Sequence, residues 1–227
     1  MVRVHLIRHG QASFGASDYD QLSDTGMLQG RILGKSRKVN GSNTVSGTLR
    51  RHIQTATAFL SEQSETVSIT QDKRWNEFDY LDVIKAHRPD METHAALVKE
   101  FANTSNPNKA FQKLYDAAVS RWASGEYDND YTESRTAFRT RVRTALENLC
   151  ADTPEDKSVY IFSSGGPISA VVQDALDLSE DATRRIERTM VNTGVTSLSL
   201  RGNTPRLITL NCHAHLQNQE AHYVTYR

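Results

Sequence analysis

Short apolar runs rich in β-branched residues alternate with stretches of helical periodicity along most of the chain, an order typical of α/β proteins. Four runs predict strands, at residues 4–7, 44–46, 67–70 and 158–162. The run at 158–162 is almost continuously apolar, as expected of a central strand buried on both faces. Two more runs, 194–200 and 206–210, flank the turn 202–205. They predict an antiparallel hairpin at one edge of the sheet.

Helical spacing of apolar residues predicts crossover helices between these strands. The predicted helices occupy the stretches 22–33, 48–60, 168–176 and 180–188. Ser23 or Asp24 can cap the first of them, and Thr48 lies near the start of the second. The pattern therefore predicts an α/β fold, a three-layer sandwich in which helices cover both faces of a mostly parallel central sheet.

The composition changes after Leu81, where β-branched runs give way to Ala, Lys, Asp and Asn. Helical patterns recur at 92–101, 109–122 and 133–149, with a polar, turn-rich break at 125–131. Because this region separates strands that should be neighbours, we expect one domain spanning 1–227 that carries 79–132 as a helical cap insertion. A solvated helical decoration without a role in binding is the alternative interpretation.

Charge and composition exclude some classes of function. The 227 residues include 27 Lys plus Arg and 27 Asp plus Glu, so no overall field recruits nucleic acid or an anionic membrane. No apolar run is long enough to span a bilayer, and the chain begins directly with a strand, so we expect a cytoplasmic location. Cys150 and Cys212 are far apart and are expected to be reduced. Oligomeric state stays open.

A metal site is not expected. His213 and His215 are the only close histidine pair, and no carboxylate at ligand spacing accompanies them. We therefore expect neither a metal nor another cofactor.

Candidate chemistry follows two of the predicted strands. Arg8-His9-Gly10 ends the first strand, at the edge where open α/β sheets bind ligands, and combines an anion-binding fork with a potential nucleophile. Ser163-Ser164-Gly165-Gly166-Pro167 follows the central strand and leaves backbone N–H groups near a helix start, which suits an anion. The alternatives are a strand that merely ends in polar residues at the first place and a tight turn without a ligand at the second. Arg50 and Arg51 point about 100° apart on their helix, so at most one faces a site shared with His9.

Several dispersed motifs occur in a definite order. They are Leu6-Ile7-Arg8-His9-Gly10-Gln11, Leu22-Ser23-x-x-Gly26-x-x-Gln29, Leu49-x-Arg51-x-x-Gln54-Thr55-Ala56, Glu77 after an apolar strand, Glu133-Ser134, and the strand with its Gly-Gly turn at 158–166. Together they resemble the histidine phosphatase superfamily, which includes cofactor-dependent phosphoglycerate mutases and acid phosphatases. The motifs span most of the chain, and the region 81–131 is the least informative.

The resemblance implies roles for individual residues. His9 would attack phosphorus and form a phosphohistidine, and Glu77 would exchange protons with the leaving group and the attacking water. Arg8, Arg51, Ser164 and Gly165 would bind the phosphoryl oxygens, and Gln11 and Ser13 would contact the rest of the substrate. A helix-capping or surface acid is the alternative for Glu77, and Arg50 is the alternative for Arg51.

The sequence departs from the family at Ser164, where a histidine normally precedes Gly-Gly. Losing such a donor costs about 3–4 kcal/mol of transition-state stabilisation in comparable sites. Three outcomes stay open: a weaker phosphatase, a replacement histidine from elsewhere such as His213 or His215, or a pocket that binds phosphate without turning it over.

The leading hypothesis for function is a phosphomonoesterase acting on a small phosphorylated metabolite, without nucleic-acid or membrane partners. A catalytically weak or inactive phosphate-ligand-binding or regulatory protein is the alternative. A mutase is disfavoured because it must protect its phosphohistidine from water, and a phosphate donor is missing at position 164. The identity of the substrate is not encoded in any motif.

Overall fold

The computed structural model describes residues 1–13, 20–39, 42–91, 93–102, 104–201, 204–217, 219 and 221–226. The chain divides into two compact units. The first unit is Met1–Glu77 with Val142–Arg227, and the second unit is Phe78–Arg141. Each is described by itself. No described helix is both long and apolar enough to cross a membrane.

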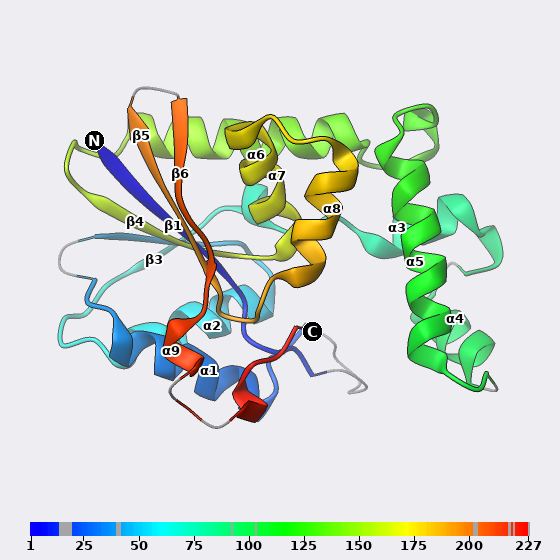
Figure 1. The fold of residues 1–227 in the computed structure, drawn as a ribbon, viewed down its shortest axis with the longest axis horizontal. Coiled ribbons are helices and arrows are strands. Elements are labelled where there is room, and N and C mark those ends of the chain that lie inside the picture. Colours follow the sequence, from blue (N-terminus) through cyan, green and yellow to red (C-terminus); the bar gives the residue numbers. More distant parts are fainter. Residues whose placement is uncertain are drawn as a thin grey trace. The chain divides into compact units, whose positions relative to one another are not determined.

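The first unit contains a mixed sheet whose described strands run in the order β3-β2-β4-β1-β5-β6 (Figure 1). The strands are β1 (Val2–Arg8), β2 (Asn43–Ser46), β3 (Ile69–Gln71), β4 (Ser158–Ser163), β5 (Val195–Arg201) and β6 (Thr204–Cys212). The first four in chain order are mutually parallel. β5 runs antiparallel to β1, and β6 runs antiparallel to β5, which confirms the predicted edge hairpin. Gly202 and Asn203 of its predicted turn lie outside the described residues.

Helices flank this sheet on both sides, as the pattern predicted (Figure 1). They are α1 (Asp24–Ser36), α2 (Arg50–Leu60), α7 (Gly165–Leu176), α8 (Glu180–Thr189) and α9 (Ala214–Gln217), with 3-10 turns η1 (Lys73–Trp75) and η4 (Ala221–Tyr223). α1 packs against α2, and α7 packs against α8. Helices α1 and α2 lie on the opposite side of the sheet from α7. The α/β class is therefore confirmed.

Helix starts differ from the prediction at two informative places. Ser23 caps α1 as expected, since its hydroxyl accepts from the Gly26 amide. Thr48, however, does not cap α2, which begins at Arg50. The carboxylate of Asp20, distant in sequence, instead accepts the Arg50 amide at 2.8 Å. α7 begins at Gly165 rather than at 168, because the first amides of a helix need no intrahelical acceptor and glycine is not excluded there.

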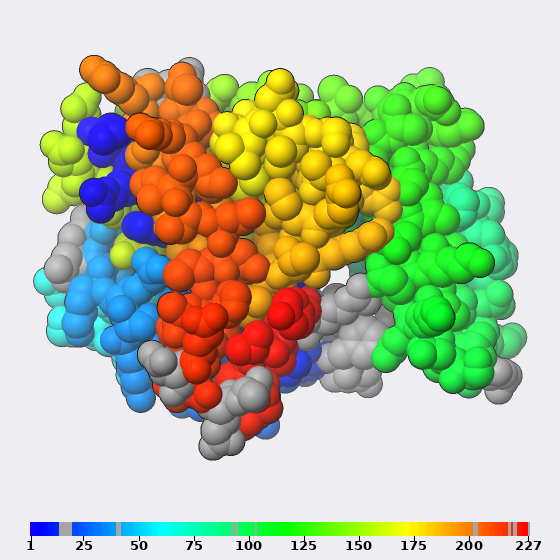
Figure 2. Space-filling view, viewed as in Figure 1, coloured from blue at the N-terminus to red at the C-terminus, as the bar shows by residue number. Residues whose placement is uncertain are grey.

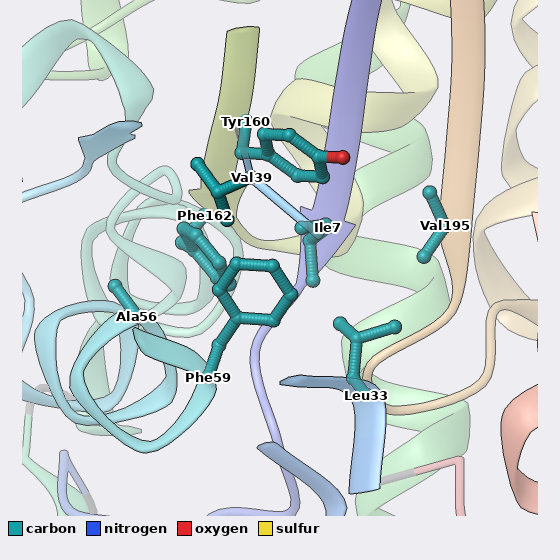
Figure 3. Close-up of a cluster of buried hydrophobic side chains, with 8 residues drawn as sticks. All are labelled: Ile7, Leu33, Val39, Ala56, Phe59, Tyr160, Phe162 and Val195. Carbon is teal, nitrogen blue, oxygen red and sulfur yellow. The ribbon is translucent and has the colours of Figure 1, made fainter. Parts of the chain in front are cut away.

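Side chains from β1, β4, β5, α1 and α2, together with Val39 of the loop after α1, form a hydrophobic core (Figure 3). Its members are Ile7, Leu33, Val39, Ala56, Phe59, Tyr160, Phe162 and Val195. The Phe59 ring lies 5.3 Å from the Phe162 ring and 5.5 Å from the Tyr160 ring, measured between centroids. Burial of each such large side chain contributes about 1.5–3 kcal/mol. Because Ile7 precedes Arg8 and Phe162 precedes Ser163, this core fixes both strand ends.

The second unit is helical in its described residues. It holds α3 (Tyr80–His87), η2 (Pro89–Met91), α4 (His94–Phe101), α5 (Pro107–Ala123), η3 (Asp128–Asp130) and the first part of α6 (Arg135–Ala151). Its aromatic centre is Trp122, whose ring lies 4.6 Å from Phe78 and 5.6 Å from Phe138. α3 was absent from the sequence prediction, and Glu92, the predicted start of the next helix, lies outside the described residues.

Candidate active site

The predicted site residues converge because three neighbouring parallel strands end together. β4 lies between β2 and β1, with Ser163 opposite Arg8 and Phe162 opposite Ser46. The segments that follow these strands therefore leave the sheet at one edge. They are 9–10 after β1, 47–52 after β2 and 164–166 after β4.

His9 is buried and held in one tautomer. The whole residue is 7% exposed, and its backbone amide donates to the Ser163 carbonyl at 2.8 Å. The imidazole Nδ1 lies 2.7 Å from the Gly10 carbonyl oxygen. A carbonyl can only accept, so Nδ1 carries the hydrogen and Nε2 keeps its lone pair. Burial, followed by the nearby cations of Arg51 and Arg8, holds the pKa of His9 well below its usual value. The ring is therefore neutral at neutral pH, with its lone pair on Nε2.

Arg51, rather than Arg50, is the arginine of α2 whose charge acts on His9. Its side chain is 11% exposed and its Nη1 lies 2.6 Å from Asp20 Oδ1. Among the charged groups near His9, Arg51 has the largest effect on the pKa of that imidazole. Arg50 is exposed. Arg8, at the end of β1, also lowers the pKa of His9, and its Nη1 donates to the Met190 carbonyl.

Glu77 lies between η1 and α3 in the sequence, and its side chain contacts the start of α7. Its Oε2 accepts the Gly166 amide hydrogen at 3.0 Å. A Cβ atom at Gly166 would lie only 2.0 Å from Glu77 Oε1, so glycine is required for this close approach. The contact is of the helix-capping kind that was the alternative reading, and it also places the carboxyl group beside the Gly-Gly turn.

Ser164 is bound by a histidine that the sequence analysis did not single out. Ser164 is 1% exposed and occupies the N-cap position of α7, yet its hydroxyl makes no capping hydrogen bond. Its Oγ lies 2.7 Å from Nε2 of His52, a fully buried residue in the first turn of α2. The His52 and His9 ring centroids are 5.7 Å apart. Burial, then the Arg51 cation, holds the pKa of His52 well below its usual value.

The two histidines considered as replacements lie in other contacts. His213 Nδ1 is 2.8 Å from the Asn211 carbonyl, and His215 Nε2 is 3.0 Å from Thr193 Oγ1. Burial lowers the pKa of His215 to about 4. The histidine that contacts Ser164 is therefore His52.

Gln11 and Ser13 line an open pocket of about 650 Å³. The other lining residues are Ala12, Gln21, Leu22, Ser23 and Asp24. The Gln11 side chain accepts from the Ser23 hydroxyl at 2.9 Å, and the Ser13 amide donates to the Gln21 carbonyl. Both residues thus lie in the segment that continues from His9 after β1.

Further residues hold the loop after β1 in place. Thr55 Oγ1 accepts the Gly10 amide at 3.0 Å, and Asn192 Nδ2 donates to the His9 carbonyl at 3.0 Å. Thr193, at a positive φ of 58°, donates its amide to the Arg8 carbonyl. A β-branched residue rarely adopts this conformation, so the backbone beside His9 stores strain. Thr55 belonged to a sequence motif, whereas Asn192 carried no signal in the sequence.

The described residues contain no cluster of three or more His, Cys, Asp or Glu side chains arranged to hold a metal ion.

In the space-filling view, β5 and β6 with α7 and α8 form one continuous face of the first unit (Figure 2). His9, His52 and Ser164 are buried.

Comparisons with known proteins identify structures of the same fold. No curated protein matches the chain. Among solved structures, a phosphoserine phosphatase from Entamoeba histolytica is 21% identical with a TM-score of 0.65, over 95% of this chain and 100% of that one. A mycobacterial glucosyl-3-phosphoglycerate phosphatase bound to VO3 is 25% identical, with a TM-score of 0.61 over 92% and 98% of the two chains. A protein described as mycobacterial hydrolase 1 is 25% identical, with a TM-score of 0.62 over 93% and 99%.

The sequence model of the histidine phosphatase superfamily (branch 1) matches residues 4–213. That range includes both strand ends, the first turn of α2 and the Gly-Gly turn described above. The chain therefore belongs to the histidine phosphatase superfamily, branch 1.

Proposed function

We propose that the protein is a phosphomonoesterase that hydrolyses a small phosphorylated metabolite through a phosphohistidine on His9. The observation that carries this proposal is the His9 Nδ1 contact with the Gly10 carbonyl, which leaves Nε2 unprotonated in a buried position beside two arginines. A neutral imidazole lone pair is the species that nucleophilic catalysis requires.

In the first step, the Nε2 lone pair attacks phosphorus while the bond from phosphorus to the ester oxygen breaks. Arg8 and Arg51 stabilise the charge that spreads over the equatorial oxygens. The amides at the start of α7 add partial positive charge there. Glu77, in its protonated form, gives its proton to the leaving alkoxide.

In the second step, water attacks the phosphohistidine. The Glu77 carboxylate takes a proton from that water as the new oxygen bond to phosphorus forms. The phosphorus–nitrogen bond breaks, its electron pair returns to Nε2, and inorganic phosphate leaves. The enzyme then has the neutral His9 with which it began.

The comparisons support a small substrate. Solved relatives are named as phosphatases of phosphoserine and of glucosyl-3-phosphoglycerate, and one structure holds 3-phosphoglyceric acid. We assign binding of the substrate's organic part to Gln11 and Ser13 because both line the open pocket. We assign residues 79–132, within the second unit, to a helical cap that sets specificity.

The test is phosphate release by the purified protein from phosphoserine, 3-phosphoglycerate and p-nitrophenyl phosphate. We expect turnover by the wild type, a loss of at least about a thousandfold in His9→Ala, and labelled phosphohistidine trapped by an alkaline quench, because its phosphorus–nitrogen bond hydrolyses in acid. His5→Asn is the matched control, since it alters a partly buried histidine on the same strand that contacts Ser197 instead.

Other outcomes identify the competing functions. Wild-type release no greater than that of His9→Ala, together with tight binding of inorganic phosphate, would favour a silent phosphate-ligand-binding protein. Transfer of the label between positions of a phosphorylated sugar acid, instead of release to water, would favour a mutase.

A further inference from the structure

We propose that His52 and Ser164 act as a pair: His52 Nε2–H holds the Ser164 oxygen, so that the Ser164 hydroxyl donates its hydrogen to a phosphoryl oxygen on His9. Ser164 is then the group that touches the substrate, and His52 is a positioning residue. This inference rests on the proposed phosphatase function and names a residue that completes its pocket.

The topology explains why two segments far apart in sequence supply this pair. Ser164 follows β4, the strand that lies between β1 and β2. His9 follows β1 on one side, and His52 lies in the helix that follows β2 on the other. Ser164 is therefore flanked by one imidazole from each neighbouring connection. Two distances agree with this placement. His52 Nε2 lies 2.7 Å from Ser164 Oγ, and the ring centroids of His9 and His52 are 5.7 Å apart.

The tautomer of His52 follows from its other nitrogen. Nδ1 is buried and has no hydrogen-bond partner among the described residues. A buried N–H without an acceptor is rarer and more costly than a buried lone pair without a donor. The hydrogen of the neutral ring is therefore on Nε2, which donates to Ser164 Oγ.

This tautomer determines what the serine does. Once Ser164 Oγ accepts from His52, its own hydrogen is available for another acceptor, and the hydroxyl makes no capping bond to α7. A phosphoryl group on His9 would bring anionic oxygens to this edge, beside the first amides of α7. A hydroxyl held at both ends donates without the reorganisation that a rotating hydroxyl needs.

The His52 ring has no room to turn away. A Cβ atom at Gly47 would lie 2.2 Å from His52 Nδ1 and 2.7 Å from Asn76 Oδ1, so the Gly47 backbone forms a wall against the ring. The opposite nitrogen is bonded to Ser164. The absence of a side chain at position 47 is therefore what allows an imidazole at position 52.

The central experiment is a double-mutant cycle with Ser164→Ala, His52→Ala and the combined variant. Orthovanadate binding and kcat/KM with p-nitrophenyl phosphate are measured for each. We expect each single change to weaken both quantities by about 10- to 100-fold, the usual effect of one hydrogen bond to a charged group. In the combined variant, vanadate affinity and kcat/KM should be lower than in the weaker of the two single variants by less than about threefold.

Conservative variants separate positioning from packing. The amide nitrogen of Gln reaches the position of histidine Nε2, whereas that of Asn corresponds to Nδ1. His52→Gln should therefore retain most of the activity that His52→Asn loses, with the difference in kcat rather than in KM. His5→Asn is the control because His5 Nδ1 contacts Ser197 Oγ at 2.9 Å, a histidine–serine pair of the same kind in the middle of β1. It should leave kcat unchanged.

Nitrogen-15 NMR of the histidine side chains reads the tautomer directly. The proposal requires a neutral His52 ring protonated on Nε2. A ring protonated on Nδ1 would overturn it, since Ser164 would then donate to His52 and have no hydrogen for the phosphoryl group.

The outcomes distinguish this inference from the proposed function. If the wild type turns over substrate and the two single substitutions have no effect, or have effects that add in the combined variant, the His52–Ser164 pair is rejected and the phosphatase function stands. Absence of turnover with coupled losses in vanadate binding would support the pair as an anion donor and reject the phosphatase. Absence of both turnover and vanadate binding would reject both.

Discussion

Arg51 Nη1 lies 2.6 Å from Asp20 Oδ1, while the other oxygen of the same carboxylate accepts the first amide of α2, that of Arg50, at 2.8 Å. One acidic side chain thus caps the helix and pairs with the arginine whose charge most lowers the pKa of His9. A phosphate arriving at the site meets an arginine that already has an anionic partner.

Replacing Asp20 should therefore strengthen anion binding. In Asp20→Asn the cap acceptor persists but the negative charge is gone, so we expect inorganic phosphate to bind several-fold more tightly and stability to change by less than about 1 kcal/mol. Isothermal titration with phosphate measures the first effect and urea unfolding the second. Asp181→Asn, which changes an acid in the first turn of α8, is the control. Weaker phosphate binding in Asp20→Asn would show that Asp20 orients Arg51 rather than competing for it.

The acid limb of the pH profile should reflect the low pKa of His9. Burial and the cations of Arg51 and Arg8 lower that pKa, so Nε2 stays unprotonated as the pH falls through 6.5, the usual histidine value. We expect kcat/KM, corrected for ionisation of the substrate, to persist below pH 6.5, and an NMR titration of His9 to show no protonation there. A His9 titration midpoint at or above 6.5 would contradict the assigned environment.

Stability should fall on acidification. His5 and His215 have pKa values lowered to about 4, chiefly by burial, against 6.5 in the unfolded chain. Below pH 6.5 the unfolded state binds protons that the folded state does not, so stability is full above about 6.5 and is lost toward 4. Each such histidine adds a slope of up to about 1.4 kcal/mol per pH unit. Urea unfolding across this range measures it, and His215→Asn should flatten the curve; an unchanged slope would count against the assignment.

Gly47→Ala should disturb the His52 ring. The new methyl group would lie 2.2 Å from His52 Nδ1, so the ring or the backbone must move. We expect at least about a tenfold loss in kcat and a destabilisation of about 1–3 kcal/mol from overpacking. The combined variant Gly47→Ala with His52→Ala removes the contact with the ring and leaves the 2.7 Å approach to Asn76 Oδ1, so Gly47→Ala should cost less stability in the His52→Ala background than in the wild type. If Gly47→Ala were fully active and stable, the ring would not be confined as described.

Asn192 should matter for the site although it bears no reactive group. Its Nδ2 donates to the His9 carbonyl at 3.0 Å, and its Oδ1 accepts from Thr225 Oγ1 at 2.9 Å. Asn192→Ala leaves buried polar groups unpaired, at a cost of about 1–3 kcal/mol, and loosens the backbone of the nucleophile. Thermal unfolding and kcat measure the two effects. Asn106→Ala, which removes the cap of α5, should lower stability without lowering kcat.

The sequence pattern predicted a strand or hairpin correctly where the residues of that segment alone determine its structure. The apolar run at 158–162 and the hairpin flanking 202–205 were predicted from composition and turn residues, and β4, β5 and β6 form there. Asp79 also offered a usable local signal, since its carboxylate caps α3 through the Leu81 and Asp82 amides. The short apolar spacing after it was not recognised as helical.

The sequence pattern could not predict hydrogen bonds between polar groups that lie far apart in the sequence. His52 is an ordinary residue of an amphipathic helix until Ser164, 112 residues later, is brought within 2.7 Å of it. The cap of α2 comes from Asp20, 30 residues before the amide that it accepts. Periodicity specifies which face of an element is buried, but it does not specify which polar groups of different elements meet.

The position of β1 has a consequence for synthesis of the chain. It precedes the other described strands in the sequence, yet its two neighbours in the sheet are β4 and β5, so that Val4 pairs with Val159 and Leu198. During synthesis this apolar strand therefore has both edges unpaired until β4 has been made, and the edge that β5 covers stays unpaired for longer. Such a strand is exposed to aggregation and is a natural binding segment for chaperones. The turn that carries Ser164 also follows β4, so a polypeptide that stops before β4 lacks both a neighbour for β1 and this turn.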